Sequence, residues 1–188
     1  LDLHKARVFV ASFDRPNIRY RVVSKVSERL QLLNFIKAEH PRDAGIVYCS
    51  TRRKVEEVAF WLSSKGVPAL PYHAGLDPQV RRSHQHKFLS DEGKIIVATI
   101  AFGLGIDKPN IRFVAHLDLP KSIEGYYQET GRAGRDGLPA NAWMTYRLSD
   151  AVRLRHLIES TGTQAVLKQV AMEKLDALLT FCEAVTCR

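Results

Sequence analysis

Short apolar runs that alternate with helical patterns constrain the fold of this chain more than any other feature. From residue 43 onward, β-branched runs predict strands at 45–49, 69–72, 94–99, 113–117 and 142–146. Helical spacing predicts a helix at 51–65 and another that begins at Asp77-Pro78. A strand that returns through a helix pairs in parallel with its predecessor. The sequence therefore predicts an α/β fold whose mostly parallel sheet is flanked by helices.

The chain before residue 43 adds two expected elements. A strand is predicted at 8–13, and a helix at 26–39 whose Val26, Leu30 and Leu33 face inward. We therefore expect this segment to contribute an additional strand to the sheet and a helix that packs on it.

The segment 149–188 has helical spacing but no strand pattern. Its first helix is expected to begin at Ser149 and Asp150, and its second to span about 163–182. Helical spacing relates the apolar residues Leu175, Leu178, Leu179 and Cys182. We expect this segment to pack as a helical appendix on the lobe formed by residues 1–148.

The net charge of +8 points to a polyanionic partner, because clustered Lys and Arg side chains neutralise phosphates. The 188 residues, 45% of them hydrophobic, suffice for the core of one domain. No apolar run of 18 residues and no secretory leader is readable, so no membrane contact is predicted. Three cysteines are too few for a disulfide scaffold, which favours a reducing compartment. Because the chain begins at Leu1 and lacks a closing polar tail, we expect it to belong to a longer protein.

Two arginines, Arg132 and Arg135, lie between glycines directly after a short expected helix. Their planar guanidinium groups suit the oxygens of a phosphate. Gly131 and Gly134 allow the backbone to turn tightly and to approach a ligand. The pattern therefore predicts a phosphate-binding loop, and the alternative is a solvated basic turn after an amphipathic helix.

The helix before these arginines is expected to be anchored by one buried face. Helical spacing relates three residues of that face, Ile123, Tyr126 and Tyr127. The residues expected to face outward are Gln128, Glu129 and the two arginines. The loop would thus be directed away from the core.

Polar residues follow three of the expected strands at the point where each strand ends. They are Ser50, Thr51 and Arg52 after the first, His73 and Gly75 after the second, and Thr99 after the third. Ligands of parallel α/β sheets bind beyond the carboxyl ends of strands, so these groups are expected to share one edge. Hydroxyls, helix N-termini and basic side chains suit a sugar-phosphate backbone. The alternatives are a helix cap at Ser50 or Thr51, a solvated Arg52 and a packed or capping His73.

Two nucleotide-binding patterns are incomplete in this sequence. A P-loop needs G-x-x-x-x-G-K-[ST], but the Gly-Lys pair at 93–94 is followed by Ile95, and Phe88 occupies the first glycine position. Segment 99–109 contains G-x-G, but Lys108 replaces the third glycine of a dinucleotide fingerprint. Phosphoryl transfer needs a P-loop lysine and a held magnesium ion, so we expect no ATP hydrolysis from this chain alone.

Several ordered segments resemble the RecQ family of DNA helicases. Gln128-x-x-Gly131-Arg132-x-Gly134-Arg135 resembles motif VI of superfamily 2 helicases, and 127–137 is similar to its RecQ version. The segments similar to motifs IV and V are 46–52 and 99–109. Those that favour RecQ over RNA helicases of the same superfamily are 12–20 and 72–76. The resemblance implies a second RecA-like lobe at 1–148, followed at 149–188 by the truncated helical start of a zinc-binding subdomain.

The resemblance also implies an ATP-dependent helicase that moves 3′ to 5′ and unwinds duplex DNA in recombination and repair. ATP with Mg²⁺ would be held mainly by the first RecA-like lobe of the same protein. Arg135 would be the arginine finger on the γ-phosphate, and Arg132 and Gln128 would couple the nucleotide state to lobe closure. Asp107, near the ribose, and Gly105 would complete the nucleotide contacts.

The expected DNA contacts are Ser50, Thr51, Arg52, His73, Gly75 and Thr99, with single strands and duplex junctions as the DNA partners. Cys187 is similar in position to the first zinc ligand of RecQ proteins, so Zn²⁺ is implied in the full-length protein only. The family implies a location at the bacterial nucleoid in the cytoplasm, or in the nucleus of a eukaryote. Two alternatives stay open, a non-catalytic nucleic-acid-binding module and an RNA helicase lobe.

Overall fold

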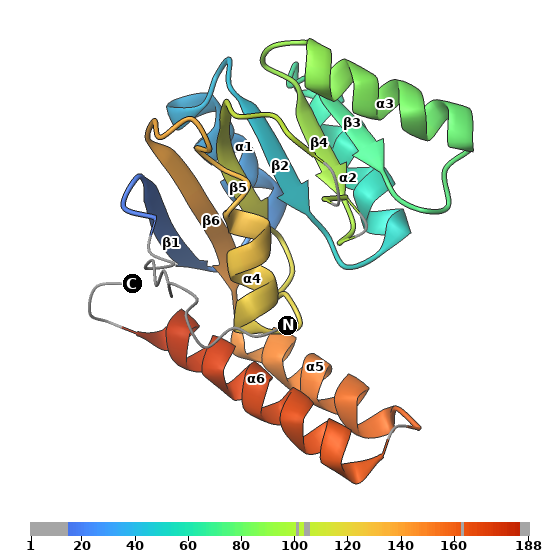
Figure 1. Ribbon diagram of the computed structural model, residues 1–188, viewed down its shortest axis with the longest axis vertical. Helices are drawn as coiled ribbons and strands as arrows, with labels where there is room; N and C mark the ends of the chain where they lie inside the picture. The colour runs from blue at the N-terminus through green and yellow to red at the C-terminus, as the bar shows by residue number, and fades with distance from the viewer. Residues whose placement is uncertain (1–14, 101, 104–105, 163, 185–188) are drawn as a thin grey trace, which may run out of the picture.

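The computed structural model describes residues 15–100, 102–103, 106–162 and 164–184, which form six strands and six helices (Figure 1). The strands are β1 (Ile18–Ser24), β2 (Ala44–Tyr48), β3 (Ala69–Tyr72), β4 (Ile95–Ala98), β5 (Ile111–His116) and β6 (Ala140–Tyr146). The helices are α1 (Glu28–Glu39), α2 (Arg52–Ser64), α3 (Pro78–Ser90), α4 (Ile123–Thr130), α5 (Leu148–Ser160) and α6 (Ala165–Glu183). One sheet has the order β1-β6-β5-β2-β4-β3, and all neighbouring strands are parallel. The predicted α/β fold is confirmed.

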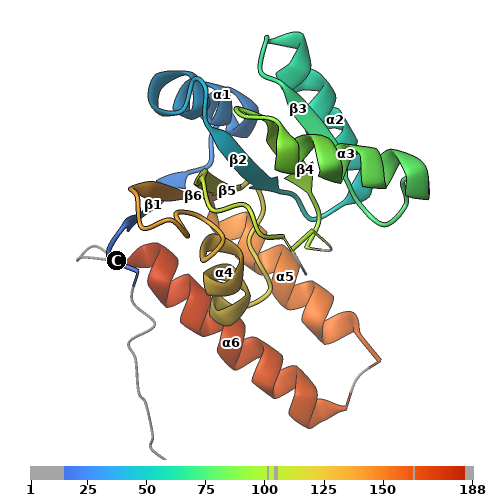
Figure 2. The same cartoon turned by 45° about the horizontal axis from the view of Figure 1, so that its top comes forward.

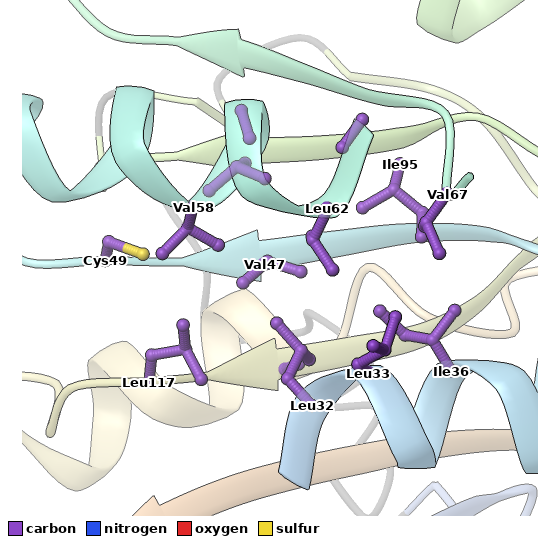
Figure 3. Close-up of a cluster of buried hydrophobic side chains, with 14 of the residues drawn as sticks. Leu32, Leu33, Ile36, Val47, Cys49, Val58, Leu62, Val67, Ile95 and Leu117 are labelled. Atoms are coloured by element: carbon purple, nitrogen blue, oxygen red, sulfur yellow. The ribbon is translucent and has the colours of Figure 1, made fainter. Parts of the chain in front are cut away.

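Side chains alternate between the two faces of the sheet and build two separate cores. On one face α1 and α2 cover Val47, as Figure 3 shows for Leu32 of α1 and Val58 of α2. On the opposite face Ile46 packs in a cluster with Phe88 of α3. Parallel strands buried on both faces form continuous apolar runs, which is why the central strands were predictable.

A third core joins α4, α5 and α6 to the sheet. Tyr126 of α4 and Met144 of β6 are fully buried there with Leu175 and Leu178 of α6. Figures 1 and 2 show α5 and α6 side by side and far from α3. The predicted helical appendix is therefore present and packs on the lobe.

Strand β1 was not predicted, and it forms one edge of the sheet beside β6. All seven of its residues pair with β6, but only Ile18 is buried. Arg19 and Arg21 interrupt its apolar pattern. An edge strand that buries little apolar surface gives a weak sequence signal. The strand expected at 8–13 lies outside the described residues.

Helix α1 begins two residues later than expected and buries a different set of side chains. Leu33 faces inward as predicted, but Val26 and Leu30 are 83% and 54% exposed, so their predicted burial is wrong. The buried residues are Leu32, Leu33, Phe35 and Ile36. This set contains more apolar area than the row of Val26 and Leu30, so the helix face that buries it is favoured.

Candidate functional site

The turn at 131–137, here called the arginine turn, joins α4 to β6. Gly134 in this turn has a φ of 57°, a backbone conformation that favours glycine. A Cβ added there would also collide with the Asn17 side chain and the Leu138 carbonyl. The tight turn predicted from the glycine spacing is therefore present.

Both arginines of the turn contact the crossing segment, residues 99–110, which connects β4 to β5. Arg132 is 9% exposed, and its Nη1 donates a hydrogen bond to the Gly103 carbonyl. The prediction that Arg132 faces outward is wrong. Gly103 explains the burial, because any Cβ at that position would collide with the Arg132 guanidinium. Arg132 therefore fixes the crossing segment at Gly103.

Arg135 is the arginine whose side chain stays accessible, at 38% exposure. Its Nη1 donates a hydrogen bond to the Ile106 carbonyl at 2.9 Å. The same atom lies 3.4 Å from Oδ1 of Asp107, whose side chain is 89% exposed. An exposed ion pair of this kind contributes about 0–1 kcal/mol, so a phosphate can compete with Asp107 for the guanidinium. Gly105 lies outside the described residues.

The residues of α4 that face outward differ from those predicted. Glu129 is buried, and its Oε2 lies 2.7 Å from Nε2 of His116. The His116 ring is itself buried and stacks on Tyr48 with a centroid distance of 5.1 Å. The prediction that Glu129 faces outward is wrong, because the buried imidazole is paired with its carboxylate. Gln128 is exposed as predicted, whereas Tyr127, predicted to be buried, is 48% exposed.

Ser50 follows β2 and is fixed by a carboxylate that follows β5. The amide and the hydroxyl of Ser50 donate hydrogen bonds to Oδ2 of Asp118 at 2.8 and 2.9 Å. Nζ of Lys54 donates to Oδ1 of the same carboxylate at 2.7 Å. No role was predicted for Asp118, although its place directly after a predicted strand, 113–117, could have indicated one.

Asp118 belongs to a cluster of charged side chains, here called the charge cluster, that joins β5 to α1, α2 and α5. Lys54 contacts Glu28 at 2.8 Å, and Lys25 lies 3.0 Å from Glu28 and 3.1 Å from Asp150. Burial alone would raise the pKa of Asp118, but the hydrogen bond and charge of Lys54, together with the Ser50 amide and the charge of Lys25, outweigh it and lower that pKa. Burial likewise disfavours the charged form of Lys54, but hydrogen bonds to Asp118 and Glu28 raise its pKa. Both partners are therefore charged at neutral pH.

Thr51 and His73 hold local structure at the ends of β2 and β3. The Thr51 hydroxyl caps α2 by accepting a hydrogen bond from the Lys54 amide at 3.2 Å. His73 is 2% exposed, with Nδ1 accepting from the Gly75 amide at 3.2 Å and Nε2 lying 3.0 Å from Glu56. The alternatives of a helix cap and a packed histidine therefore describe these two residues, and the His73 ring is not presented to a ligand.

The remaining polar residues do gather at adjacent strand ends. Arg52 is exposed at the start of α2 and lies against Gly75, where an added Cβ would come within 3.0 Å of its guanidinium. Thr99 directly follows β4 and is half-buried, and its amide donates to the Tyr72 carbonyl at 3.3 Å. Because β2, β4 and β3 are neighbours in the sheet, these residues lie close to Ser50 along one edge.

The two described cysteines, Cys49 and Cys182, are buried in the cores and form no disulfide within the described residues, and burial raises the pKa of Cys49. Within the described ranges, no group of three or more His, Cys, Asp or Glu side chains is placed to hold a metal ion. Cys187 lies outside those ranges. None of the described helices has the length and apolar character needed to cross a membrane.

Two family models match this chain. Residues 24–137 match the helicase conserved C-terminal domain, and residues 148–188 match the RecQ zinc-binding domain. The chain is 48% identical over its whole length to the ATP-dependent DNA helicase RecQ of Haemophilus influenzae, and spans 30% of that protein. It is 44% identical over its whole length to the RecQ-like DNA helicase BLM of Xenopus laevis, and spans 14% of it. The chain thus corresponds to less than a third of these relatives.

A solved structure has the same fold. It is the Mss116p DEAD-box helicase domain 2 bound to an RNA duplex, with a TM-score of 0.63. The match covers 85% of this chain and 69% of the other, at 20% sequence identity. At that identity the similarity supports the RecA-like architecture alone.

Proposed function

Because the chain belongs to the RecQ family, as a helicase carboxyl-terminal lobe, we propose that it is the second RecA-like lobe of an ATP-dependent DNA-unwinding motor. The full-length protein moves 3′ to 5′ along single-stranded DNA and opens duplex junctions in recombination and repair. It works at the nucleoid of a bacterium or in a nucleus. The net charge of +8 supports a polyanionic partner for this lobe.

The observation that carries this proposal is the different burial of the two motif VI arginines. Arg132 is buried against Gly103, whereas Arg135 is 38% exposed beside Asp107. ATP is held mainly by the first lobe, so a group of the second lobe that stabilises charge on the transferred phosphate must be accessible at the surface of its own lobe. Arg135 meets that requirement and is therefore the arginine finger.

Arg132 then acts inside the lobe as the coupling residue. Its hydrogen bond to the Gly103 carbonyl links the arginine turn to the crossing segment, which begins at the DNA-facing end of β4. Thr99 lies in this segment directly after β4, and Gln128 is exposed on the helix that precedes the turn. A change in the position of the turn on nucleotide binding is thus passed to the segment that contacts DNA.

The residues around Arg135 supply only part of a nucleotide site. Asp107 is exposed next to the guanidinium and accepts hydrogen bonds from the ribose hydroxyls. Gly105, which lies outside the described residues, is proposed as a second nucleotide contact. The sequence contains no P-loop, so the first RecA-like lobe of the full-length protein holds most of ATP and Mg²⁺. Catalysis therefore depends on closure of the two lobes.

DNA lies along the edge formed by the carboxyl ends of β2, β3 and β4. Ser50, Arg52 and Thr99 contact its phosphates directly, since each lies at one of these strand ends and none is fully buried. Thr51 and His73, predicted as direct DNA contacts, instead support the DNA-binding edge indirectly. Thr51 presents the N-terminus of α2 to a phosphate, and His73 shapes the turn that ends at Gly75.

Cys187 contributes the first of the thiolate ligands of a structural zinc site in the full-length protein. The match of residues 148–188 to the RecQ zinc-binding domain supports this assignment. A closed zinc site needs four ligands, so the others come from outside this chain.

The experiment that tests the proposed function compares four substrates with the full-length protein. ATP hydrolysis and strand separation are measured with DNA duplexes carrying a 3′ or a 5′ single-stranded tail, and with the matching RNA duplexes. We expect unwinding of the 3′-tailed DNA only. Preference for RNA would make the protein an RNA helicase, and nucleic-acid binding without hydrolysis would make it a non-catalytic module.

A further inference from the structure

Arg15, which precedes β1 in the sequence, is hydrogen-bonded to the backbone of the arginine turn. The guanidinium of Arg15 donates three hydrogen bonds to backbone carbonyls of the turn, to Gly131 at 3.2 Å, Ala133 at 3.2 Å and Gly134 at 2.9 Å. Asn17 adds two more, from Nδ2 to the carbonyls of Gly134 at 2.8 Å and Leu138 at 3.0 Å. We call this arrangement the carbonyl clamp.

The clamp acts on carbonyls of the turn beyond α4, of which that of Gly134 also accepts a hydrogen bond from the Gly137 amide at 3.0 Å. Helix α4 ends at Thr130, and the carbonyls of Tyr127, Glu129 and Thr130 in its last turn accept hydrogen bonds from the amides of residues 131, 132 and 133, so the carbonyls bound by Arg15 are those that follow the helix. A guanidinium near a helix C-terminus also interacts favourably with the partial negative charge there. Arg15 therefore stabilises one arrangement of the backbone between the end of α4 and Gly134.

The Asn17 side chain packs closely against the arginine turn at Gly134. The Asn17 amide nitrogen occupies the place where a side chain at Gly134 would begin, 2.5 Å from an ideal Cβ. The Ala140 amide, at the start of β6, donates to the Asn17 carbonyl at 2.9 Å and so anchors the clamp to the sheet. Along the chain, Arg132 lies between the bound carbonyls of Gly131 and Ala133, and Arg135 directly follows that of Gly134.

The clamp residues lie outside the part of the chain that matches the helicase C-terminal domain, which begins at residue 24. Arg15 is separated by 119 residues from Gly134 in the sequence. The helicase C-terminal domain match includes neither clamp residue. Both lie in segment 12–20, which resembles RecQ proteins, but no role was predicted for either of them. Their relation to the arginine turn emerges only from the fold.

We propose that Arg15, assisted by Asn17, is a positioning residue for Arg135. The clamp fixes the turn so that Arg135 projects from the lobe in the orientation in which it meets the transferred phosphate. This inference rests on the proposed function of Arg135. Arg15 touches neither nucleotide nor DNA and acts only through the turn.

The test measures kcat and KM for ATP at saturating DNA in the full-length protein. Misplacement of a catalytic group by about 1 Å costs on the order of a hundredfold, so Arg15→Ala is expected to lower kcat by roughly ten- to hundredfold. KM for ATP is expected to stay within about twofold, because ground-state binding is untouched. Arg15→Lys is expected to recover part of kcat, since an ammonium group replaces the charge but not the three-way fork.

Arg21→Ala is the matched control. Arg21 lies in β1, is 28% exposed and makes a two-pronged contact with Glu39 at 2.6 and 2.9 Å, without touching the turn. Its removal also deletes guanidinium hydrogen bonds, but it leaves the arginine turn untouched, so kcat is expected to be unchanged. The melting temperatures of the two variants are compared to match their stabilities. DNA affinity, measured for both, reports whether the lobe is folded.

A second variant pair separates this inference from the proposed function. If Arg15 acts through Arg135, then Arg15→Ala lowers kcat in the wild-type background but has no further effect in an Arg135→Ala background. An equal loss in both backgrounds, or a kcat equal to that of Arg21→Ala, overturns the inference while the arginine finger stands. Normal turnover of Arg135→Ala overturns the finger and the positioning role together.

Discussion

Replacement of Asp118 by asparagine is expected to destabilise the lobe by about 2 kcal/mol. A hydrogen bond to a charged group contributes about 1.5–3 kcal/mol, and the loss of one partner from a buried ion pair costs about 3–5 kcal/mol. Asparagine keeps an acceptor for Ser50 but loses the charge that compensates Lys54, whose ammonium lies 2.7 Å away. Glu28, 2.8 Å from Lys54, remains as a partner for the ammonium group. The expected loss of about 2 kcal/mol is therefore smaller than the cost of about 3–5 kcal/mol for a fully unpaired ion.

Thermal unfolding of the 188-residue chain at pH 7, followed by circular dichroism, measures this loss. For a domain of this size about 2 kcal/mol corresponds to a fall in Tm of about 4–8 °C. Asp176→Asn is the control, because Asp176 forms an ion pair with Arg155 at 2.6 Å in which the side chains are 58% and 51% exposed. That change is expected to cost about 0–1 kcal/mol.

The stability difference between the wild type and Asp118→Asn is also expected to depend on pH. The pKa of Asp118 is lowered in the folded state, so its contribution is present above the unfolded pKa of about 3.9 and is lost as pH falls through the folded pKa. The pKa of Lys54 is raised, so its contribution is present below about 10.4 and is lost as pH rises through the folded pKa. The difference should be constant near neutral pH and shrink below about pH 4. Equal Tm values for Asp118→Asn and Asp176→Asn would refute the structural role of the charge cluster.

Three further changes test other parts of the site. Arg52→Ala in the full-length protein is expected to weaken single-stranded DNA binding for all sequences. In fluorescence anisotropy, the slope of log affinity against log salt concentration should decrease in magnitude by about 0.7. An unchanged slope would remove Arg52 from the phosphate contacts. Cys187→Ser is expected to abolish zinc binding by the full-length protein, and retention of one ion per chain in metal analysis would contradict its assignment. Gly134→Ala is expected to cost about 1–3 kcal/mol more than Gly66→Ala in thermal unfolding, because the strain of a positive φ is common to both positions but only the Cβ at 134 collides with neighbours. Equal costs would show that the clamp tolerates the added methyl group.

Local patterns in the sequence were sufficient to predict most of the fold. The central strands are buried on both faces and form apolar runs, and α3 begins with Asp77 and Pro78 as predicted. Strand β1 was missed because it lies at the edge and carries arginines. The inward face of α1 was misassigned because two apolar rows compete along that helix, and only contact with the sheet decides between them.

The candidate site was predictable in its residues but not in their environments. The glycine and arginine spacing indicated the turn, yet the burial of Arg132 depends on Gly103, which lies 29 residues earlier in the sequence. The pairing of Ser50 with Asp118 joins residues 68 positions apart. Contacts of this range are set by the order of strands in the sheet, which no local pattern encodes.

Turnover of the full-length protein carrying Arg135→Ala tests the central claim most directly. The finger acts where charge develops in the transition state, so ATP hydrolysis is expected to fall by roughly 10³-fold or more. The affinities for ATP and DNA are expected to stay within a few-fold. Arg135→Lys should fail nearly as badly, because an ammonium group cannot span two phosphate oxygens.

Arg132→Ala completes the comparison, and its melting temperature is measured alongside because the side chain is buried. Loss of hydrolysis in Arg135→Ala with binding retained is the result that the assignment of the finger predicts. Near-normal turnover of Arg135→Ala, with hydrolysis lost in a folded Arg132→Ala, would transfer the finger to Arg132. Normal hydrolysis by both variants would contradict the helicase interpretation of the arginine turn.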